Sequence, residues 1–440
     1  MGVIHTDGFI DGLYTLVTKV PPSILEDCIS ASVDALACAG FSAAGTETAN
    51  DISQWLASQG RGVPNDAGDL CARIVKDDFD SYNPGTSGHP IAMILPALIA
   101  GRHHARAPVM PIMATALEFM TRLGRMYGPG LRAAGHHPST ILGGAAAVIA
   151  AAMAKELPPT SIRLALLLYF SSVSGRYTNL SGPQRIFQTS NAVRTASFAV
   201  NYAEEAGRTS MRYEWWETLD SAVPMEQRLP YGQPEIEWWT SLSPTQIKPF
   251  PACAYFTDTL RQTHTFLESI DAFRHQRDIE EIYLEVPRHV FKAHMSDMPT
   301  AQNEIPFSLS YNVALLLQHG DPIWSPRSAQ LTETTLATAS KVKVACDETS
   351  LEVPVQETKG MLTVRTSGSV CHGEITYRRA TTRPDPDLVR RKLELACREN
   401  AVDQSVADKF IEEWMASLDA PKERLSGLHS PSITSSLRDA

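Results

Sequence analysis

One polar loop, Asp78-Phe79-Asp80-Ser81-Tyr82-Asn83-Pro84-Gly85-Thr86-Ser87-Gly88-His89-Pro90, leads directly into an apolar run from Ile91 to Ala100. The loop carries two carboxylates, a tyrosine and a histidine among glycines and prolines, which interrupt regular structure. The apolar run predicts a buried helix over residues 90–101. Polar side chains on a loop that a rigid helix anchors often carry chemistry. This stretch therefore predicts a helical core with a functional loop at its edge.

A second loop, Gly135-His136-His137-Pro138-Ser139-Thr140, has the same character and opens an alanine-rich helix. Both loops place a histidine before a proline at a predicted helix N-terminus, where free backbone N–H groups and the helix dipole favour anions. We therefore expect the two loops to face one anion-binding pocket. The alternative, in which each loop is an ordinary helix start with a polar turn, remains open.

Length and composition predict a soluble protein of two domains. The chain has 440 residues, of which 43% are hydrophobic and 20% charged, which is ordinary for a globular protein with a sizeable core. A net charge of -10 without a lysine- or arginine-rich block argues against a nucleic-acid partner. An anionic substrate would therefore have to be bound by local cations.

Cysteine spacing and hydropathy exclude several other classes. The seven cysteines are scattered without a CxxC pair, which predicts reduced thiols and neither a zinc knuckle nor an iron-sulfur cluster. No secretory signal is apparent at the N-terminus. The longest apolar stretches, Ile91–Ala100 and Ile141–Ala154, are shorter than the roughly 20 residues that span a bilayer. We expect a cytoplasmic protein with no membrane partner.

Periodicity changes along the chain from helical to alternating. The predicted helices are 22–39, 67–77, 90–101, 109–126, 140–155, 164–174, 191–206, 254–273, 308–319, 386–399 and 405–418. The predicted strands are 282–286, 341–346, 351–356, 361–366 and 373–379, with turns at Asp347–Ser350 and Lys359-Gly360 that suit antiparallel hairpins. The fold class is therefore mainly α: an all-helical domain (1–264), a smaller α+β domain (265–385), C-terminal helices that return to the first domain (386–420), and a mobile tail (421–440).

Several blocks of sequence, in order across about residues 20–420, resemble the MmgE/PrpD family. This family includes 2-methylcitrate dehydratase, cis-aconitate decarboxylase and iminodisuccinate epimerase. The blocks are Asp78-Phe79-Asp80…Gly88-His89-Pro90, Gly135-His136-His137-Pro138, Arg185…Asn191-Ala192, Ile247-Lys248-Pro249-Phe250-Pro251-Ala252-Cys253 and the segment from Pro306 to Ala314.

The resemblance implies a helical domain capped by an α+β lid, an active site between them, and a homodimer. It also implies an enzyme without metal or cofactor that moves a proton next to a carboxylate of a di- or tricarboxylate. One departure from the family pattern is Arg185, which stands where a lysine is expected. Arginine keeps the cation but cannot act as a base at neutral pH.

Such chemistry needs cations for the carboxylates, a base for the carbon-bound proton and an acid for the leaving group. His89 is the candidate for proton transfer, because histidine titrates near neutrality. Asp78 and Asp80 orient its ring or act as acid or base; alternatively, they cap a helix and accept hydrogen bonds from loop amides. Lys248 and Arg185 are the candidate carboxylate anchors, with a surface lysine and a structural salt bridge as their alternatives.

The remaining candidates lie on the same two loops. His137 binds a carboxylate or donates a proton, and Tyr82 donates a hydrogen bond to substrate or packs. His136 contacts substrate or serves as a spacer. We assign catalytic roles to His89, Asp78, His137 and Lys248 and substrate binding to Arg185, Asp80, Tyr82 and His136, with no metal ligands.

The leading functional prediction is dehydration of a 2-alkylcitrate-like tricarboxylate. The Gly88-His89-Pro90 block and the segment Arg228-Leu229-Pro230-Tyr231-Gly232 favour it over the alternatives. These alternatives are decarboxylation of a cis-aconitate-like acid, epimerisation of a dicarboxylate, and a non-catalytic relative that acts as a binding protein.

Overall fold

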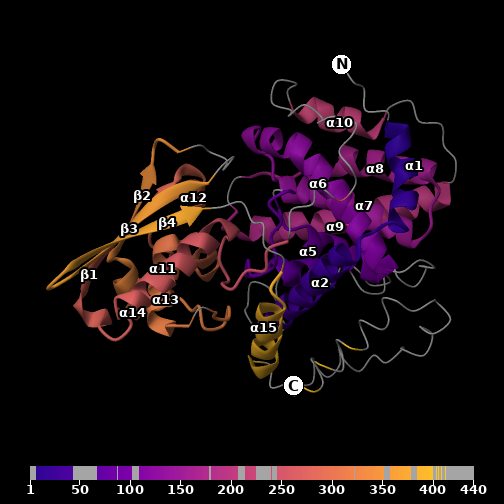
Figure 1. Ribbon diagram of the computed structural model, residues 1–440. Coiled ribbons are helices and arrows are strands. Elements are labelled where there is room, and N and C mark those ends of the chain that lie inside the picture. The colour runs from indigo at the N-terminus through magenta and orange to yellow at the C-terminus, as the bar shows by residue number, and fades with distance from the viewer. Residues whose placement is uncertain are drawn as a thin grey trace.

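The computed structural model describes most of the chain and shows a mainly helical protein with one small sheet (Figure 1). The described residues are 6–42, 67–86, 88–101, 109–177, 180–206, 214–223, 239, 245–321, 323–350, 357–377, 384–399, 403, 405, 408 and 412. Their hydrophobic side chains form two main cores, one from residues between 10 and 223 together with Ala396, and one from residues between 250 and 377. We call the two parts the helical unit and the sheet unit.

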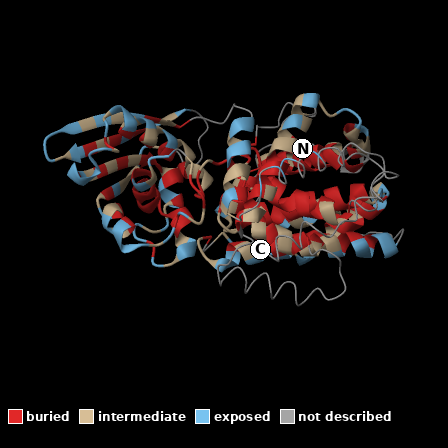
Figure 2. Ribbon diagram, turned by 90° about the horizontal axis from the view of Figure 1, so that it is seen from below, coloured by how far each residue is buried: buried red, intermediate tan, exposed pale blue. Residues whose placement is uncertain are grey.

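The helical unit is built around α7 (Pro138–Ala154), whose residues are all buried. A helix that is apolar on every side must be covered on every side, and its alanines and glycines let neighbouring helices approach closely. It contacts α5, α6, α8 and α9, and the burial is visible as the red interior of Figure 2. The other helices of the unit are α1 (Thr6–Val17), α2 (Pro22–Ser42), α4 (Ala67–Val75), α5 (Pro90–Gly101), α6 (Val109–Ala133), α8 (Pro159–Ser172), α9 (Pro183–Ala206) and α10 (Trp215–Ala222).

The sheet unit contains four strands in the order β2-β1-β3-β4. They are β1 (Ile279–Pro287), β2 (Val342–Asp347), β3 (Thr358–Thr366) and β4 (Val370–Tyr377). In β1 the alternation buries Ile282, Leu284 and Val286, as expected for a sheet with one face on a core. The helical segments around the sheet are η3 (Ala254–Phe256), α11 (Thr257–Ser269), η4 (Gln276–Asp278), α12 (Arg288–Ala293), η5 (Gln302–Phe307), α13 (Leu309–His319) and α14 (Glu333–Ala339).

The last described helix, α15 (Pro386–Glu399), lies on the helical unit, and its last residue, Glu399, also forms an ion pair with Arg327 of the sheet unit. It packs against α2, and its Ala396 belongs to the core of the helical unit. The core of the sheet unit begins at Phe250, so the predicted boundary between 264 and 265 falls inside α11. The predicted tail 421–440 and most of the predicted helix 405–418 lie outside the described residues.

Strand pairing is where the structure departs most from expectation. Only β1–β3 and β3–β4 pair antiparallel, whereas β1 and β2 pair in parallel. The predicted turn at Lys359-Gly360 is wrong, because both residues lie within β3. A Cβ at position 360 would lie 2.5 Å from the carbonyl oxygen of Glu285, so this glycine permits close strand packing. The predicted strand 351–356 lies outside the described residues.

Two simpler predictions concern thiols and membranes. All seven cysteines fall in the described residues and all are free, as expected for reduced thiols. Across the described part of the chain, no helix combines the length and the apolar character needed to cross a bilayer.

Candidate active site

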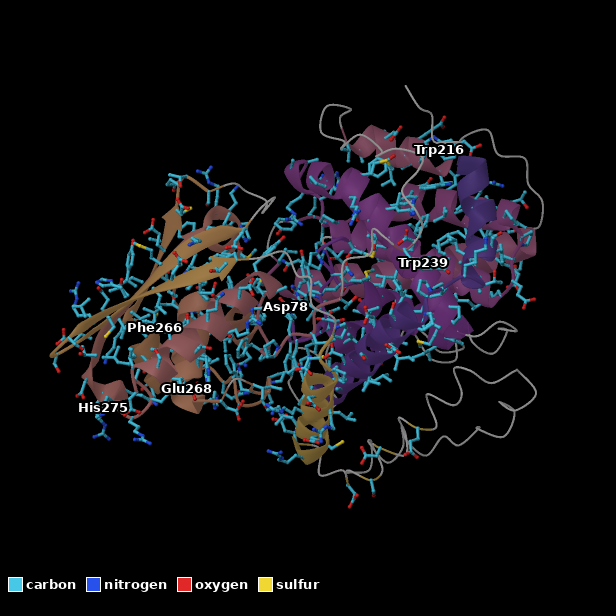
Figure 3. The ribbon with its side chains drawn as sticks, viewed as in Figure 1. Asp78, Trp216, Trp239, Phe266, Glu268 and His275 are labelled. Carbon is cyan, nitrogen blue, oxygen red and sulfur yellow. The ribbon has the colours of Figure 1, made fainter. Side chains whose placement is uncertain are left out.

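The two histidine-proline loops meet where the helical unit faces the sheet unit. Each histidine is followed by the proline that begins a helix, Pro90 for α5 and Pro138 for α7. A Cβ at Gly88 would lie 2.2 Å from Ser139 Oγ, so only glycine allows the loops to touch here. His89 and His137 consequently open on the same pocket, and Asp78 lies between the two units (Figure 3).

Both units contribute walls to this pocket. The polar walls of the helical unit include Asp78, Tyr82, His89, Arg132, His137 and Arg185. The sheet unit and the segment leading into it add Cys253, Ala254, Tyr255 and Phe307. The expected convergence of both loops on one pocket is therefore a feature of the structure.

The Asp78–Pro90 loop is fixed from two sides. Tyr82 and Gln246 exchange backbone hydrogen bonds of 2.9 and 2.7 Å, which ties the loop to the segment that carries Lys248. From the other side, Lys392 Nζ of α15 donates a 2.7 Å hydrogen bond to the carbonyl oxygen of Phe79. Phe79 lies between Asp78 and Asp80 in the chain, so both contacts limit the movement of these carboxylates.

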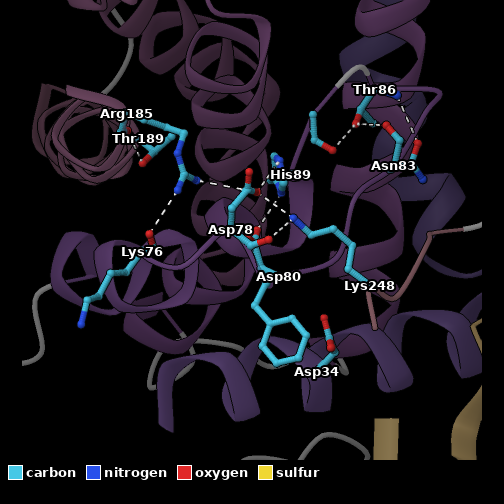
Figure 4. Close-up of polar contacts among 12 residues, drawn as sticks. Asp34, Lys76, Asp78, Asp80, Asn83, Thr86, His89, Arg185, Thr189 and Lys248 are labelled. Atoms are coloured by element: carbon cyan, nitrogen blue, oxygen red, sulfur yellow. Dashed lines mark hydrogen bonds and ion pairs between the residues drawn. The ribbon is translucent and has the colours of Figure 1, made fainter. Parts of the chain in front are cut away.

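Asp78 is the centre of the polar cluster (Figure 4). Its Oδ1 lies 2.7 Å from Lys248 Nζ, 3.7 Å from His89 Nε2 and 3.9 Å from Arg185 Nη1. Burial alone would raise the pKa of this carboxyl, but the ammonium of Lys248, followed by Arg185 and His89, holds it well below its usual range. Asp78 is therefore an ionised carboxylate at neutral pH. Its backbone adopts φ 50°, a left-handed conformation that is uncommon outside glycine.

Lys248 supports Asp78 from behind and does not line the pocket. Its side chain is only 1% exposed, so the alternative of a solvated surface lysine is wrong. The ammonium donates to Asp78 Oδ1, to the carbonyl oxygen of Asp78 and to the carbonyl oxygen of Ala252, the last at 3.1 Å. Because an ammonium has three donors, these contacts use all of them. The geometry makes Lys248 an anchor of Asp78 rather than of a ligand.

Asp80 holds the ring of His89. Its Oδ2 lies 2.9 Å from His89 Nδ1, and Asp80 does not line the pocket, so it does not occupy the expected substrate-binding position. Although burial opposes ionisation, the contact with His89 lowers the pKa of Asp80. An ionised carboxylate only accepts hydrogen bonds, so His89 Nδ1 carries the proton that is donated to Asp80. The other ring nitrogen of His89, Nε2, faces Asp78. The two carboxylates bind the side chains of Lys248, Arg185 and His89 here instead of capping a helix.

His137 is buried and neutral. It is 6% exposed, and its Nδ1 lies 2.7 Å from Thr140 Oγ1. Burial, reinforced by the electrostatic effect of His89, Arg185 and Arg132, lowers the pKa of His137 to about 3. The ring is therefore a neutral hydrogen-bonding group in the pocket wall.

Tyr82 and His136 lie in different places. The ring of Tyr82 lines the pocket with its centre 5.6 Å from that of His89, and burial raises its pKa well above 10. His136 is turned away, with Nδ1 3.3 Å from the carbonyl oxygen of Gly175, and it does not line the pocket. The spacer alternative describes its position.

Arg132, Tyr177 and Tyr255 line the pocket, and none of the three was predicted from the sequence as a site residue. Arg132 Nη1 donates a 2.7 Å hydrogen bond to Tyr255 Oη, and its guanidinium lies 5.7 Å from the Tyr177 ring centre. The one signal available was proximity along the chain, because Arg132 precedes the second loop by three residues and Tyr255 follows the Lys248 block. This signal is weak without the fold.

One group of side chains has the composition of a metal site. Potential ligand atoms of Asp78, Asp80 and His89 lie within 4.8 Å of one another, the one such group of three or more in the residues that the structure describes. A divalent ion there would have to compete with Lys248 for Asp78 Oδ1. Lys248 and Arg185 already supply the positive charge that these carboxylates need, so the arrangement suits proton chemistry better than metal binding.

No protein-family model matches the chain, and no curated protein sequence matches it. The resemblance of the sequence blocks therefore stays an expectation, and the function has to be argued from the geometry of the pocket.

Proposed function

We propose that this protein is a lyase that needs no cofactor and removes water from a small tricarboxylate of the 2-alkylcitrate type. The observation that carries the proposal is the pairing of an oriented imidazole, His89, with an ionised Asp78 in a pocket that also contains two guanidinium groups. Proton abstraction beside a carboxylate needs a positioned base and cations for the charge that develops.

His89 is the base and then the acid. Its Nε2 takes the proton from the carbon next to a carboxylate, and the C–H electron pair becomes the new C=C bond as the neighbouring C–O bond breaks. The imidazolium returns that proton to the departing hydroxyl, which leaves as water and restores the neutral ring. Asp80 and Asp78 stabilise the transient imidazolium, because they face its two nitrogens at 2.9 and 3.7 Å. General acid–base catalysis of this kind contributes about 10²–10⁴ in rate.

The cations and the neutral donors have separate roles in this proposal. Arg185, which lies beside Asp78, stabilises the negative charge that accumulates on the substrate carboxylate during proton abstraction, and Arg132 supplies a second cation in the pocket. Tyr82 donates a hydrogen bond to the leaving hydroxyl, and the neutral ring of His137 completes its surroundings. The sheet unit acts as a lid, because Tyr255 and Phe307 form the wall that closes the pocket.

The expected homodimer is also part of the proposal. Phe198 and Tyr202 on α9 are 72% and 52% exposed, an apolar face that supports association. Light scattering of the wild type and of Phe198→Glu tests it. A dimer that the substitution converts to a monomer agrees with this proposal, and a monomeric wild type contradicts it.

Decarboxylation of a cis-aconitate-like acid is the second candidate. The observation in its favour is that Val75, Met93 and Leu180 add an apolar portion to the pocket wall. Apolar surroundings disfavour a carboxylate relative to neutral carbon dioxide, so they favour loss of the carboxylate. The carbanion that remains would take its proton from the imidazolium form of His89.

A substrate panel with product masses separates these reactions. Purified protein is incubated in deuterated buffer with citrate, 2-methylcitrate and cis-aconitate. Loss of water supports the leading proposal, and loss of carbon dioxide supports the second. Deuterium uptake without loss of mass indicates epimerisation. No change with any acid indicates a non-catalytic protein and contradicts both candidates. His89→Asn, which keeps a donor toward Asp80, should abolish turnover, whereas His275→Asn at a 64% exposed site should not.

Metal dependence is tested in the same assay. The proposal predicts an unchanged rate after treatment with EDTA and after addition of zinc or magnesium. A rate that EDTA abolishes and a divalent ion restores would assign Asp78, Asp80 and His89 to a metal site and contradict the mechanism.

A further inference from the structure

The pocket contains one positive charge, on Arg132, that no acidic side chain of the described residues balances. Asp78, which lines the pocket, lies beside both Lys248 and Arg185, and Asp80, which lies behind the pocket wall, contacts His89. Among the residues that the structure describes, no carboxylate forms an ion pair with Arg132. The pocket therefore has one fixed cation whose counter-charge has to come from elsewhere.

The guanidinium of Arg132 is also short of hydrogen-bond acceptors. It projects from the last turn of α6, and within the described part of the chain it makes one hydrogen bond, from Nη1 to Tyr255 Oη. Its Nε is buried and has no partner among the described residues. A buried donor without an acceptor is costly, and a guanidinium has five donors. The charge and the hydrogen bonding of Arg132 both call for an anionic ligand.

Aromatic rings surround this cation. The guanidinium lies 5.7 Å from the ring centre of Tyr177 and 6.0 Å from that of Tyr255. The ring of Tyr255 also lies 6.0 Å from the ring of Tyr82, which faces His89. A continuous aromatic wall therefore links the Arg132 end of the pocket to the His89 end. The rings shield part of the guanidinium from water, which strengthens its attraction for an anion.

We propose that Arg132 is a substrate-carboxylate anchor, distinct from the Asp78 cluster, which binds the carboxylate farthest from the reacting carbon. The inference rests on the proposed function in one respect, which is the end of the substrate that reacts. The presence of an anion site at Arg132 does not depend on that function. Guanidinium suits this task, because its planar fork forms two parallel hydrogen bonds to one carboxylate. Arg132 thereby selects acids that carry a further carboxylate at one end of the molecule.

The test compares two unreactive acids that differ by one terminal carboxylate. Tricarballylate carries three carboxylates and no hydroxyl, so it cannot lose water; 2-methylsuccinate is the same skeleton without one terminal carboxylate. Their Kd values are measured by calorimetry on the wild type, on Arg132→Gln and on Arg274→Gln, a control at an 81% exposed arginine. The wild type and the control should bind tricarballylate at least about tenfold more tightly than 2-methylsuccinate, as expected for one charge-assisted, bidentate contact.

In Arg132→Gln the ratio of the Kd for 2-methylsuccinate to the Kd for tricarballylate should fall below about threefold, because Arg132 is the group that recognises the extra carboxylate. A wild type without the preference, or an Arg132→Gln variant that keeps it, would overturn the inference. If Arg132→Gln does not fold, the same two Kd values are measured on Arg132→Lys. A ratio that is at least about threefold lower than in the wild type supports the role of the planar guanidinium, and an unchanged ratio overturns it. Because binding is measured without turnover, a wild type that shows the preference but transforms no acid would refute the proposed reaction and leave Arg132 in place.

Discussion

Two buried lysines in this molecule each bind an aspartate, and their surroundings differ. Lys248 binds Asp78 at the pocket, where Arg185 and His89 are also within 4 Å of the same carboxylate. Lys392 of α15 binds Asp34 of α2 in the core, where both side chains are completely buried. The first pair faces a cavity, and the second is sealed.

The pKa values of the two carboxyls shift in opposite directions because different numbers of cations surround them. Burial raises the pKa of Asp34 above its usual range, and Lys392, which forms an ion pair with it, does not reverse this. For Asp78 burial acts in the same direction, but Lys248, Arg185 and His89 outweigh it and lower the pKa. A buried carboxylate thus stays ionised where several cations surround it. This difference suits Asp78 to chemistry and the Asp34 pair to stability.

The two pairs are mechanically connected through one residue. Lys392 Nζ also contacts Phe79, donating to its carbonyl oxygen at 2.7 Å and lying 3.8 Å from its ring centre. Phe79 separates Asp78 from Asp80, so the sealed pair supports the backbone of the pocket carboxylates from the core side. Four predictions test the contrast between the pairs, from the largest expected effect to the smallest.

Breaking the sealed pair should have the largest effect. Lys392→Met leaves Asp34 buried without its cation and removes the donor to Phe79, and loss of one partner of a buried pair costs about 3–5 kcal/mol. Denaturant unfolding should show this loss. The double variant Asp34→Leu/Lys392→Met should recover most of it, because no unpaired charge remains. A single variant as stable as the wild type would show that the pair is dispensable.

Neutralising the pocket pair should affect turnover more than stability. Asp78→Asn keeps the shape of the side chain and removes the charge that faces His89 and Lys248. We expect kcat/KM to fall by at least about 10²-fold, or about 2.7 kcal/mol, with a smaller loss of folding stability. The comparison with Lys392→Met is the control. If Asp78→Asn lost stability but kept its kcat/KM, Asp78 would have a structural role, like Asp34, and no role in turnover.

Acid should destabilise the protein through His137, which faces the cations of the pocket. Its pKa is lowered to about 3, so between that value and about 6.5 the unfolded state binds a proton that the folded state does not. Stability therefore falls as the pH falls through this window, by about 2 kcal/mol at pH 5 for this one group. Unfolding curves of the wild type and of His137→Asn at pH 8 and pH 5 isolate the contribution of His137 to this loss of stability. Equal losses in both proteins would contradict a neutral, buried His137.

Exchanging one pocket cation for another should have the smallest effect. Arg185→Lys keeps a positive charge beside Asp78 and loses the 3.2 Å hydrogen bond from Nη2 to the carbonyl oxygen of Lys76. The expected change is within about 1 kcal/mol in stability and about tenfold in kcat/KM, because the charge is retained. A loss as large as that of Asp78→Asn would show that the guanidinium geometry, and not the charge, is required.

Much of the fold could be predicted from local patterns. The predicted helices 22–39 and 90–101 correspond to α2 and α5, because amphipathic spacing and apolar runs report burial directly. The parallel pairing of β1 with β2 could not be predicted, since it depends on contacts between residues about 60 positions apart. Gly360 was mistaken for a turn residue because a sequence does not show that a neighbouring strand requires its small size.

The site could be predicted where its residues cluster along the chain. Asp78, Asp80 and His89 lie on one loop, and the sequence identified them together. Arg132 and Lys392 were missed, because each lies in a helix with other charged residues and resembles a surface cation. Only tertiary packing brings Arg132 to the pocket and Lys392 to Phe79. The role of Lys248 changed for the same reason, since its three acceptors come from two separate segments.

The proposed mechanism requires that Asp78 remain a carboxylate, and the contrast between the two pairs predicts that Asp34 is the more easily protonated of the two. The direct measurement is a pH titration of the protein with ¹³C-labelled aspartate, followed by NMR, with the two signals assigned from Asp78→Asn and Asp34→Asn. We predict that the Asp78 signal keeps its ionised position down to the lowest pH at which the protein is folded, and that Asp34 takes up its proton at a higher pH. Protonation of Asp78 at the same pH as Asp34, or above it, would contradict the account.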